Sequence, residues 1–238
     1  MADAQFTTTR WTVVLAARAR EAPGSEDALA RLCETYWYPL YVFVRRSGHD
    51  AQEARDITQG YFLRLLEADY LQNVRQEAGR FRSFLLSSIK HFMANRRRDA
   101  AALKRGGGQA QLSLDAEQAE ARFRLEPRHE RTPDREYERQ WARAIIQRAH
   151  RRLREELEQA GKPDHYRLLA RFLSGGQGSE YEEVAGELES TASAVKMSVS
   201  RMRKRFGGIL RDEVSLTVEQ DDQVDAEVRH LMTVFRGD

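Results

Sequence analysis

Apolar residues recur every three or four positions along most of this chain, which is the spacing of one face of a helix. The segments with this pattern are residues 25–46, 50–67, 80–102, 133–160, 163–174, 179–188, 191–211 and 224–235. No segment alternates apolar and polar residues in the manner of a strand, and no internal repeat stands out. The periodicity therefore predicts an all-α fold. Residues 1–22 add a short apolar pattern that ends near Pro23.

The helical segments fall into two groups, separated by a polar stretch that contains Gly106, Gly107 and Gly108. Glycine runs of this kind favour flexible linkers. The predicted organisation is a small helical module (1–102), a flexible linker (103–131), a second small helical module that ends in a helix-turn-helix (132–213) and a short acidic C-terminal helical extension (214–238). Within the first module, Pro39 disfavours helical geometry at the preceding residue, so a break or kink is expected there.

The end of the second module carries the pattern of a helix-turn-helix. Ser179 and Glu182 have capping-box spacing, and Thr191 is placed to N-cap the following helix. The inward side of that helix comprises Val195, Val199, Met202 and Phe206, and its other face comprises Lys196, Met197, Ser200, Arg201, Arg203 and Lys204. Residues 190–211 contain six basic residues and no acid. This arrangement fits a DNA-recognition helix; the alternative is an ordinary helical hairpin with a solvated charged face.

Composition narrows the classes of function. The chain has 238 residues, 41% hydrophobic and 32% charged, with a net charge of only +2. No apolar run approaches membrane-spanning length, so we expect a cytoplasmic protein without a membrane partner. Its single cysteine, Cys33, occupies an apolar helical position and cannot form an internal disulfide. No metal-ligand spacing, phosphate loop or nucleophile motif is visible, so we predict no enzymatic activity and no cofactor.

The segment that starts at residue 80 combines aromatic and basic side chains. Its basic residues are Arg80, Arg82, Lys90, Arg96, Arg97 and Arg98, against the single acid Asp99. Cations that meet phosphates and rings that stack on bases suit single-stranded nucleic acid. The alternative is that the aromatic residues belong to the core, which we favour for Phe84, Leu85 and Phe92.

Several motifs resemble, in their order and separation, the extracytoplasmic-function (ECF) type of bacterial RNA polymerase sigma factor. The first module is similar to the core-binding and minus-ten-binding region in YPLYVFVRRSG (38–48), EARDITQGYFLRL (53–65) and GRFRSFL (79–85). The second is similar to the minus-thirty-five-binding region in YEEVA (181–185) and AVKMSVSRMRKR (194–205). The resemblance covers most of residues 25–102 and 133–212.

The resemblance implies an alternative sigma factor that binds core RNA polymerase and directs it to promoter DNA, which is double-stranded upstream and single-stranded at the melted element. The polymerase would contact Glu53, Asp56, Gln59 and Arg64. The minus-ten DNA would contact Asn73, Arg75, Arg80, Arg82, Lys90, Asn95, Arg96 and Arg97. The minus-thirty-five DNA would contact Ser193, Lys196, Met197, Ser200, Arg201 and Lys204. An anti-sigma factor or a kinase is a further candidate partner. A rival interpretation is a free-standing helix-turn-helix regulator that uses residues 133–212 alone, and a recombinase is a more distant one.

The sequence departs from the family pattern at Gly60, where an acid is more common, and at Glu189, which replaces the glycine of the turn. Because the polymerase-binding helix is then one charge short, Thr58 is a candidate regulatory site at which a phosphate would add negative charge. The acidic extension suggests a second hypothesis, in which residues 212–227 cover Lys196–Arg205 in the free protein. The alternative is that the terminal helix packs on the second module as additional core.

Overall fold

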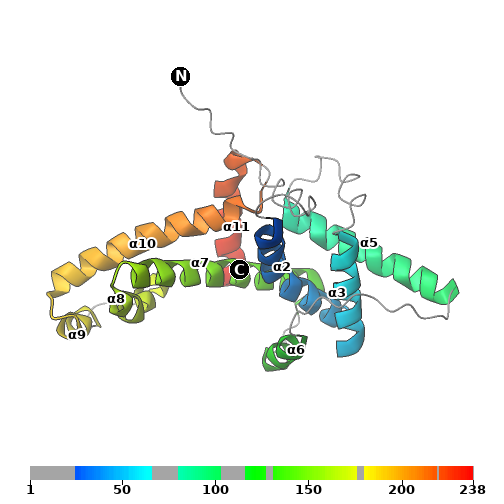
Figure 1. Ribbon diagram of the computed structural model, residues 1–238, viewed down its shortest axis with the longest axis horizontal. Coiled ribbons are helices and arrows are strands. Elements are labelled where there is room, and N and C mark those ends of the chain that lie inside the picture. Colours follow the sequence, from blue (N-terminus) through cyan, green and yellow to red (C-terminus); the bar gives the residue numbers. More distant parts are fainter. Residues whose placement is uncertain are drawn as a thin grey trace, which may run out of the picture. The chain divides into compact units, whose positions relative to one another are not determined.

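The computed structural model describes residues 25–65, 80–102, 116–126, 131–175, 180–218 and 220–237. Every regular element within these ranges is a helix, which confirms the predicted all-α fold (Figure 1). No helix in this part of the chain is both long and apolar enough to cross a membrane. The apolar pattern of residues 1–22, the cap at Ser179, and Asn73 and Arg75 lie outside the described residues.

The helices belong to two compact units. Unit 1 comprises Met1–Ala144 together with Ser215–Asp238, and unit 2 comprises Ile145–Val214. This division differs from the predicted modules, because the first part of α7 (Pro133–Gln159) and the C-terminal extension belong to unit 1. Apolar periodicity identifies the face of a helix that is buried, but it does not identify the element that covers that face.

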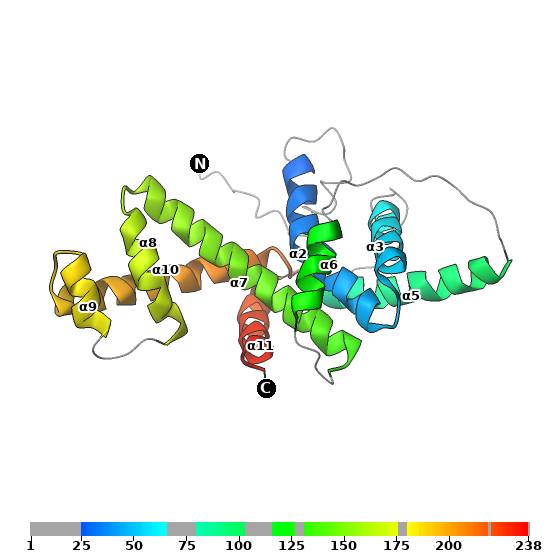
Figure 2. The same ribbon diagram turned by 90° about the horizontal axis from the view of Figure 1, so that it is seen from below.

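Unit 1 is built around α2 (Ser25–Arg46), which contacts α3 (Ala51–Leu65) and α5 (Phe81–Ala102). The helix α2 continues through Pro39 without a break, and its ribbon bends (Figure 2), which fits the kink that was the other expected outcome. Cys33 is buried as predicted, and burial raises the pKa of its thiol to about 11. The large buried side chains of unit 1 include Leu40, Tyr41, Val44, Tyr61, Phe62, Leu85, Ile89, Tyr137 and Trp141.

A helix, α6 (Ala116–Leu125), forms within the stretch that was predicted to be a flexible linker. Glu120 of α6 accepts hydrogen bonds from Tyr41 Oη at 2.6 Å and from Arg45 Nε at 3.1 Å, both on α2. The Arg45 and Arg46 guanidinium groups lie 4.7 and 5.0 Å from the centre of the Phe123 ring. Part of the predicted linker is thus a helix that contacts residues some 75 positions away in the sequence, whereas residues 103–115 and 127–130 lie outside the described residues.

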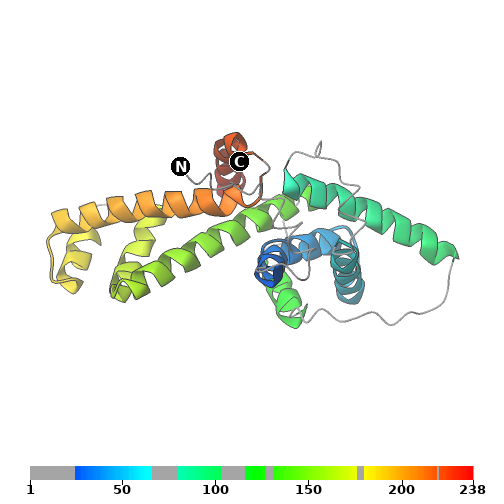
Figure 3. The same cartoon turned by 45° about the horizontal axis from the view of Figure 1, so that its top comes forward.

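Unit 2 contains the rest of α7, α8 (Pro163–Leu169), the 3-10 helix η2 (Ala170–Ser174), α9 (Glu180–Glu187) and α10 (Ala192–Ser215). The helix α10 runs alongside α7 (Figure 3). Ion pairs between the two helices include Arg148–Glu213, Arg152–Asp212 and Arg205–Glu156. The buried side chains of unit 2 include Leu153, Phe172, Val184, Val195, Val199 and Ile209.

The C-terminal extension forms η3 (Asp221–Gln223) and α11 (Val224–Arg236) and packs within unit 1. Glu227 pairs there with Arg80, which directly precedes α5, and with Arg82 of α5. One hypothesis from the sequence placed the terminal helix on the second module as additional core, and His230 of α11 does contact Glu138 and Trp141 of α7, which belong to that predicted module. The other placed the acids of the extension over Lys196–Arg205, whereas Glu227 pairs with Arg80 and Arg82 in unit 1. An acidic helix can pair with any basic segment, so charge alone did not select the right one.

Candidate nucleic-acid interface

Backbone hydrogen bonds fix the turn between α9 and α10 at both of its ends. The helix α9 ends in a Schellman motif, in which Ser190 N donates to Ala185 O at 2.9 Å. This motif places a residue in the left-handed region, and Glu189 has φ 48° there. The helix α10 starts with the predicted N-cap, because Ala194 N donates to Thr191 Oγ1 at 3.2 Å. Two helices are thus joined by a short turn of defined geometry.

The apolar side of α10 packs against the rest of unit 2. Val195, Val199 and Met202 are buried, as the periodicity predicts. Phe206 is half-buried, and its ring centre lies 4.7 Å from that of His150 on α7. Burial lowers the pKa of His150, which favours the neutral imidazole in this contact. These contacts decide which face of α10 is turned to solvent.

The solvent-facing side of α10 carries the residues that the sequence assigns to duplex DNA. The exposed residues are Ser193, Lys196, Met197, Ser200, Arg201 and Lys204. Met197 is 60% exposed although it is large and apolar. Arg201 and Lys204 form no ion pair with another described residue. Positive charge, small hydroxyl groups and one flexible apolar side chain on a single helix face can contact phosphates and base edges in a major groove.

Two other arginines of α10 bind within unit 2. Arg203 Nη2 donates to Phe172 O at 2.7 Å and so satisfies a carbonyl of η2. Arg205 forms a two-point ion pair with Glu156, at 2.7 Å from Nε and 2.6 Å from Nη2. The hydrogen bonds from Arg205 hold the pKa of Glu156 below its ordinary value. Periodicity groups Arg203 with the DNA-facing residues, but a tertiary contact uses its guanidinium.

Residues near this face that the sequence did not assign to DNA contacts come from other elements. Lys196 Nζ lies 5.6 Å from the centre of the Tyr181 ring on α9, a position in which the ring attracts the cation. Beside Arg201 lies a pocket of about 380 Å³ whose lining includes Lys162 and His165. Nothing in the local sequence of these residues predicts their place, because it depends on how α8 and α9 cross α10.

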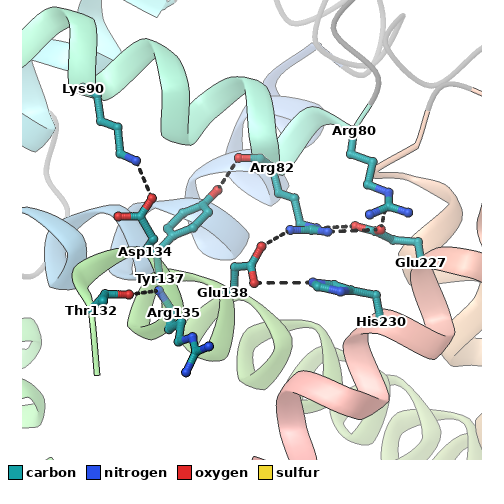
Figure 4. Close-up of polar contacts among 10 residues, drawn as sticks. All are labelled: Arg80, Arg82, Lys90, Thr132, Asp134, Arg135, Tyr137, Glu138, Glu227 and His230. Carbon is teal, nitrogen blue, oxygen red and sulfur yellow. Dashed lines mark hydrogen bonds and ion pairs between the residues drawn. The ribbon is translucent and has the colours of Figure 1, made fainter. Parts of the chain in front are cut away.

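Basic residues of α5 that the sequence assigns to melted DNA have partners inside unit 1 (Figure 4). Lys90 forms an ion pair with Asp134 of α7. Arg96 is exposed, and its Nη1 donates to Asp56 O at 3.2 Å. The side chain of Arg97 lies outside the described residues. The basic face of α5 is therefore partly neutralised by the protein itself, unlike that of α10.

Arg82 requires a correction to the predicted DNA contacts. It is only 3% exposed, its Nε lies 2.5 Å from Glu227 Oε1, and its Nη1 lies 2.5 Å from Glu138 Oε1. Burial of the guanidinium lowers its pKa, but pairing with the two carboxylates outweighs burial and raises it. Arg82 is thus a cation enclosed in unit 1. The residues that enclose it are far away in the sequence, so no local pattern distinguishes it from a surface arginine.

The exposed side of α3 carries Glu53, Asp56 and Arg64, and Gln59 is half-buried. Thr58 was predicted to be a surface site for a regulatory phosphate, and that prediction is wrong. Its side chain is fully buried, and its hydroxyl has no hydrogen-bond partner among the described residues. The reason is that α3 contacts both α2 and α5, which widens its buried face beyond a single stripe.

The structure thus has two surfaces with different chemistry. One is the basic face of α10, where Arg201 and Lys204 form no ion pair with a described residue, and the other is the face of α3 that carries Glu53 and Asp56. Comparison of the chain with protein-family models, curated proteins and solved structures found no match. Function must therefore be inferred from these surfaces and from the sequence motifs.

Proposed function

We propose that the chain is an alternative sigma factor of the ECF type. It binds core RNA polymerase in the cytoplasm, directs the enzyme to promoter DNA and assists in opening the duplex, whereas RNA synthesis belongs to the polymerase. The observation that carries this proposal is the solvent-facing side of α10. There, Lys196, Arg201 and Lys204 extend from a helix whose other side is buried, and they follow a capped turn of defined geometry.

The exposed face of α3 supports the same proposal. Glu53 and Asp56 lie on adjacent turns of α3, and both side chains are exposed. Glu53 N donates to Asp50 Oδ1 at 2.8 Å, so an aspartate side chain caps the start of this helix. An acidic helix face complements a basic partner and steers its approach. Together with the order of the motifs, it fits a protein that joins polymerase and DNA.

Duplex binding by α10 is tested with Lys196→Ala and Arg201→Ala. Loss of a base contact should weaken binding by about 1–3 kcal/mol and relax specificity at one promoter position. Loss of a phosphate contact should weaken binding to all sequences alike, and the slope of the logarithm of the binding constant against the logarithm of the salt concentration should decrease by about one. Arg154→Ala is the matched control, because Arg154 is an exposed arginine of α7 and its removal changes the net charge equally. If both α10 variants bind upstream promoter DNA as the parent does, α10 is not the recognition helix.

Polymerase binding is tested with the charge reversals Glu53→Lys and Asp56→Lys. We expect them to prevent association with core polymerase and promoter-dependent transcription, while duplex binding by α10 is unchanged. A free-standing helix-turn-helix regulator predicts a different result. It would bind duplex DNA through the same face, yet the purified parent would neither join core polymerase nor support transcription.

A further inference from the structure

Glu227 of α11 lies at the start of α5, between two arginines that the proposed function assigns to melted DNA (Figure 4). Its side chain is fully buried. Its Oε1 accepts a hydrogen bond from Arg82 Nε at 2.5 Å, and its Oε2 lies 2.9 Å from Arg80 Nε. Both carboxylate oxygens are therefore used, and two guanidinium groups converge on one anion.

The extension contacts the start of α5 at a second point. Phe81 N, one of the amides that begin a helix without an intrahelical partner, donates to Thr217 O at 3.4 Å. Val224 and Leu231 are the buried apolar residues of α11, whereas Phe235 near its end is 45% exposed. A terminal helix with few buried apolar contacts is the kind of element that opens at low cost in free energy.

A carboxylate and a phosphate offer an arginine the same pair of acceptor oxygens. Glu227 therefore occupies the guanidinium groups as a phosphate of single-stranded DNA would. The side chain of Arg80 is still 40% exposed, so a phosphate can approach it before α11 moves. Arg82 also pairs with Glu138 of α7, and it stays enclosed at least until the Glu227 carboxylate leaves its Nε.

We infer that α11 is an autoinhibitory latch, in which Glu227 withholds Arg80 and Arg82 from nucleic acid. A single-stranded segment binds to these arginines by displacing α11. This inference rests on the proposed function, because it takes the start of α5 to be a DNA-binding surface. It also relocates the role of the acidic extension from the recognition helix to the helix proposed to meet melted DNA.

The latch is tested by loosening α11 in two independent ways. Glu227→Gln preserves the size of the side chain and removes its charge, and Leu231→Ala removes apolar contact without changing charge. Asp222→Asn is the matched control, because Asp222 is an exposed acid of η3 and the substitution changes the net charge as Glu227→Gln does. Affinity for an oligothymidylate of about 20 nucleotides is measured by fluorescence anisotropy over a series of salt concentrations.

Both loosened variants should bind the oligonucleotide about tenfold more tightly than the parent, as expected when charge-assisted hydrogen bonds become available. The logarithm of the binding constant falls linearly with the logarithm of the salt concentration, and this slope should become steeper by about 0.7 for each phosphate gained. Asp222→Asn should bind as the parent does. Adding Arg80→Ala to Glu227→Gln should remove the gain.

Hydrogen exchange in the unmodified chain gives a second test that does not depend on the folding of any variant. Saturating oligonucleotide should reduce the protection of the α11 amides. Unchanged protection overturns the latch, as does parent-like affinity in Glu227→Gln and Leu231→Ala that retain their helical circular dichroism. Duplex binding by α10 and assembly with core polymerase are measured separately, so failure of the latch and failure of the proposed function are distinguishable.

Discussion

Glu189 offers a direct test of what stabilises the turn before α10. It occupies the left-handed position of the Schellman motif, with φ 48°, and its own N donates to Gly186 O at 3.3 Å. An L-residue in the left-handed region costs about 1–2 kcal/mol, whereas a glycine adds about 0.4–1 kcal/mol of conformational entropy to the unfolded chain. The difference predicts that Glu189→Gly raises the free energy of unfolding by about 0.5–1 kcal/mol.

The end of α7 provides a matched comparison within the same chain. There Lys162 N donates to Leu157 O at 2.8 Å, Gly161 N donates to Glu158 O at 3.0 Å, and Gly161 has φ 69°. A Cβ added at Gly161 would meet no atom within 4 Å, so any effect of Gly161→Ala comes from the backbone. We expect this substitution to lower the free energy of unfolding by about 1 kcal/mol, the opposite sign to Glu189→Gly.

The assay is urea unfolding followed by far-ultraviolet circular dichroism, with the slope of the transition compared between variants. Glu189→Gln retains the strained backbone and removes the charge, so its stability should stay within about 0.3 kcal/mol of the parent. If Glu189→Gly destabilises the protein while Gly161→Ala behaves as expected, strain in the left-handed region does not limit this turn. That result would refute the reasoning.

Three further predictions follow from the burial of polar groups. Thr58→Val should raise the free energy of unfolding by about 1–2 kcal/mol because it removes a buried hydroxyl without a partner, and Thr58→Glu should lower it by at least about 3 kcal/mol; urea unfolding measures both. Burial lowers the folded-state pKa of His150 and of His230 below the ordinary value of 6.5, so the unfolded chain binds protons first. Thermal stability should therefore decrease as pH falls below about 6.5, and replacing both histidines by Gln should flatten this dependence. Glu120→Ala removes the acceptor for Tyr41 and Arg45 and should reduce amide protection in α6, while α9 keeps its protection in the same hydrogen-exchange experiment.

Much of the local structure follows from the sequence, because helix caps and apolar periodicity depend on residues only a few positions apart. The cap at Thr191 and the cap at Thr132, where Arg135 N donates to Thr132 Oγ1 at 3.4 Å, lie where the residue types place them. The same holds for the outward face of α10. Its apolar stripe specifies the buried side, and the residues that face DNA in the proposed function follow by the geometry of a single helix.

Only the tertiary structure determines the ion pairs and the burial that depend on contacts between different helices. The sequence marks Arg82 as basic and Glu227 as acidic, but only the fold brings them together across 145 positions. Thr58 is buried because two helices cover α3, and α6 is ordered because Glu120 meets α2. Periodicity and capping act within a few residues along one helix, whereas ion pairs and burial depend on distances between helices, which no local pattern contains.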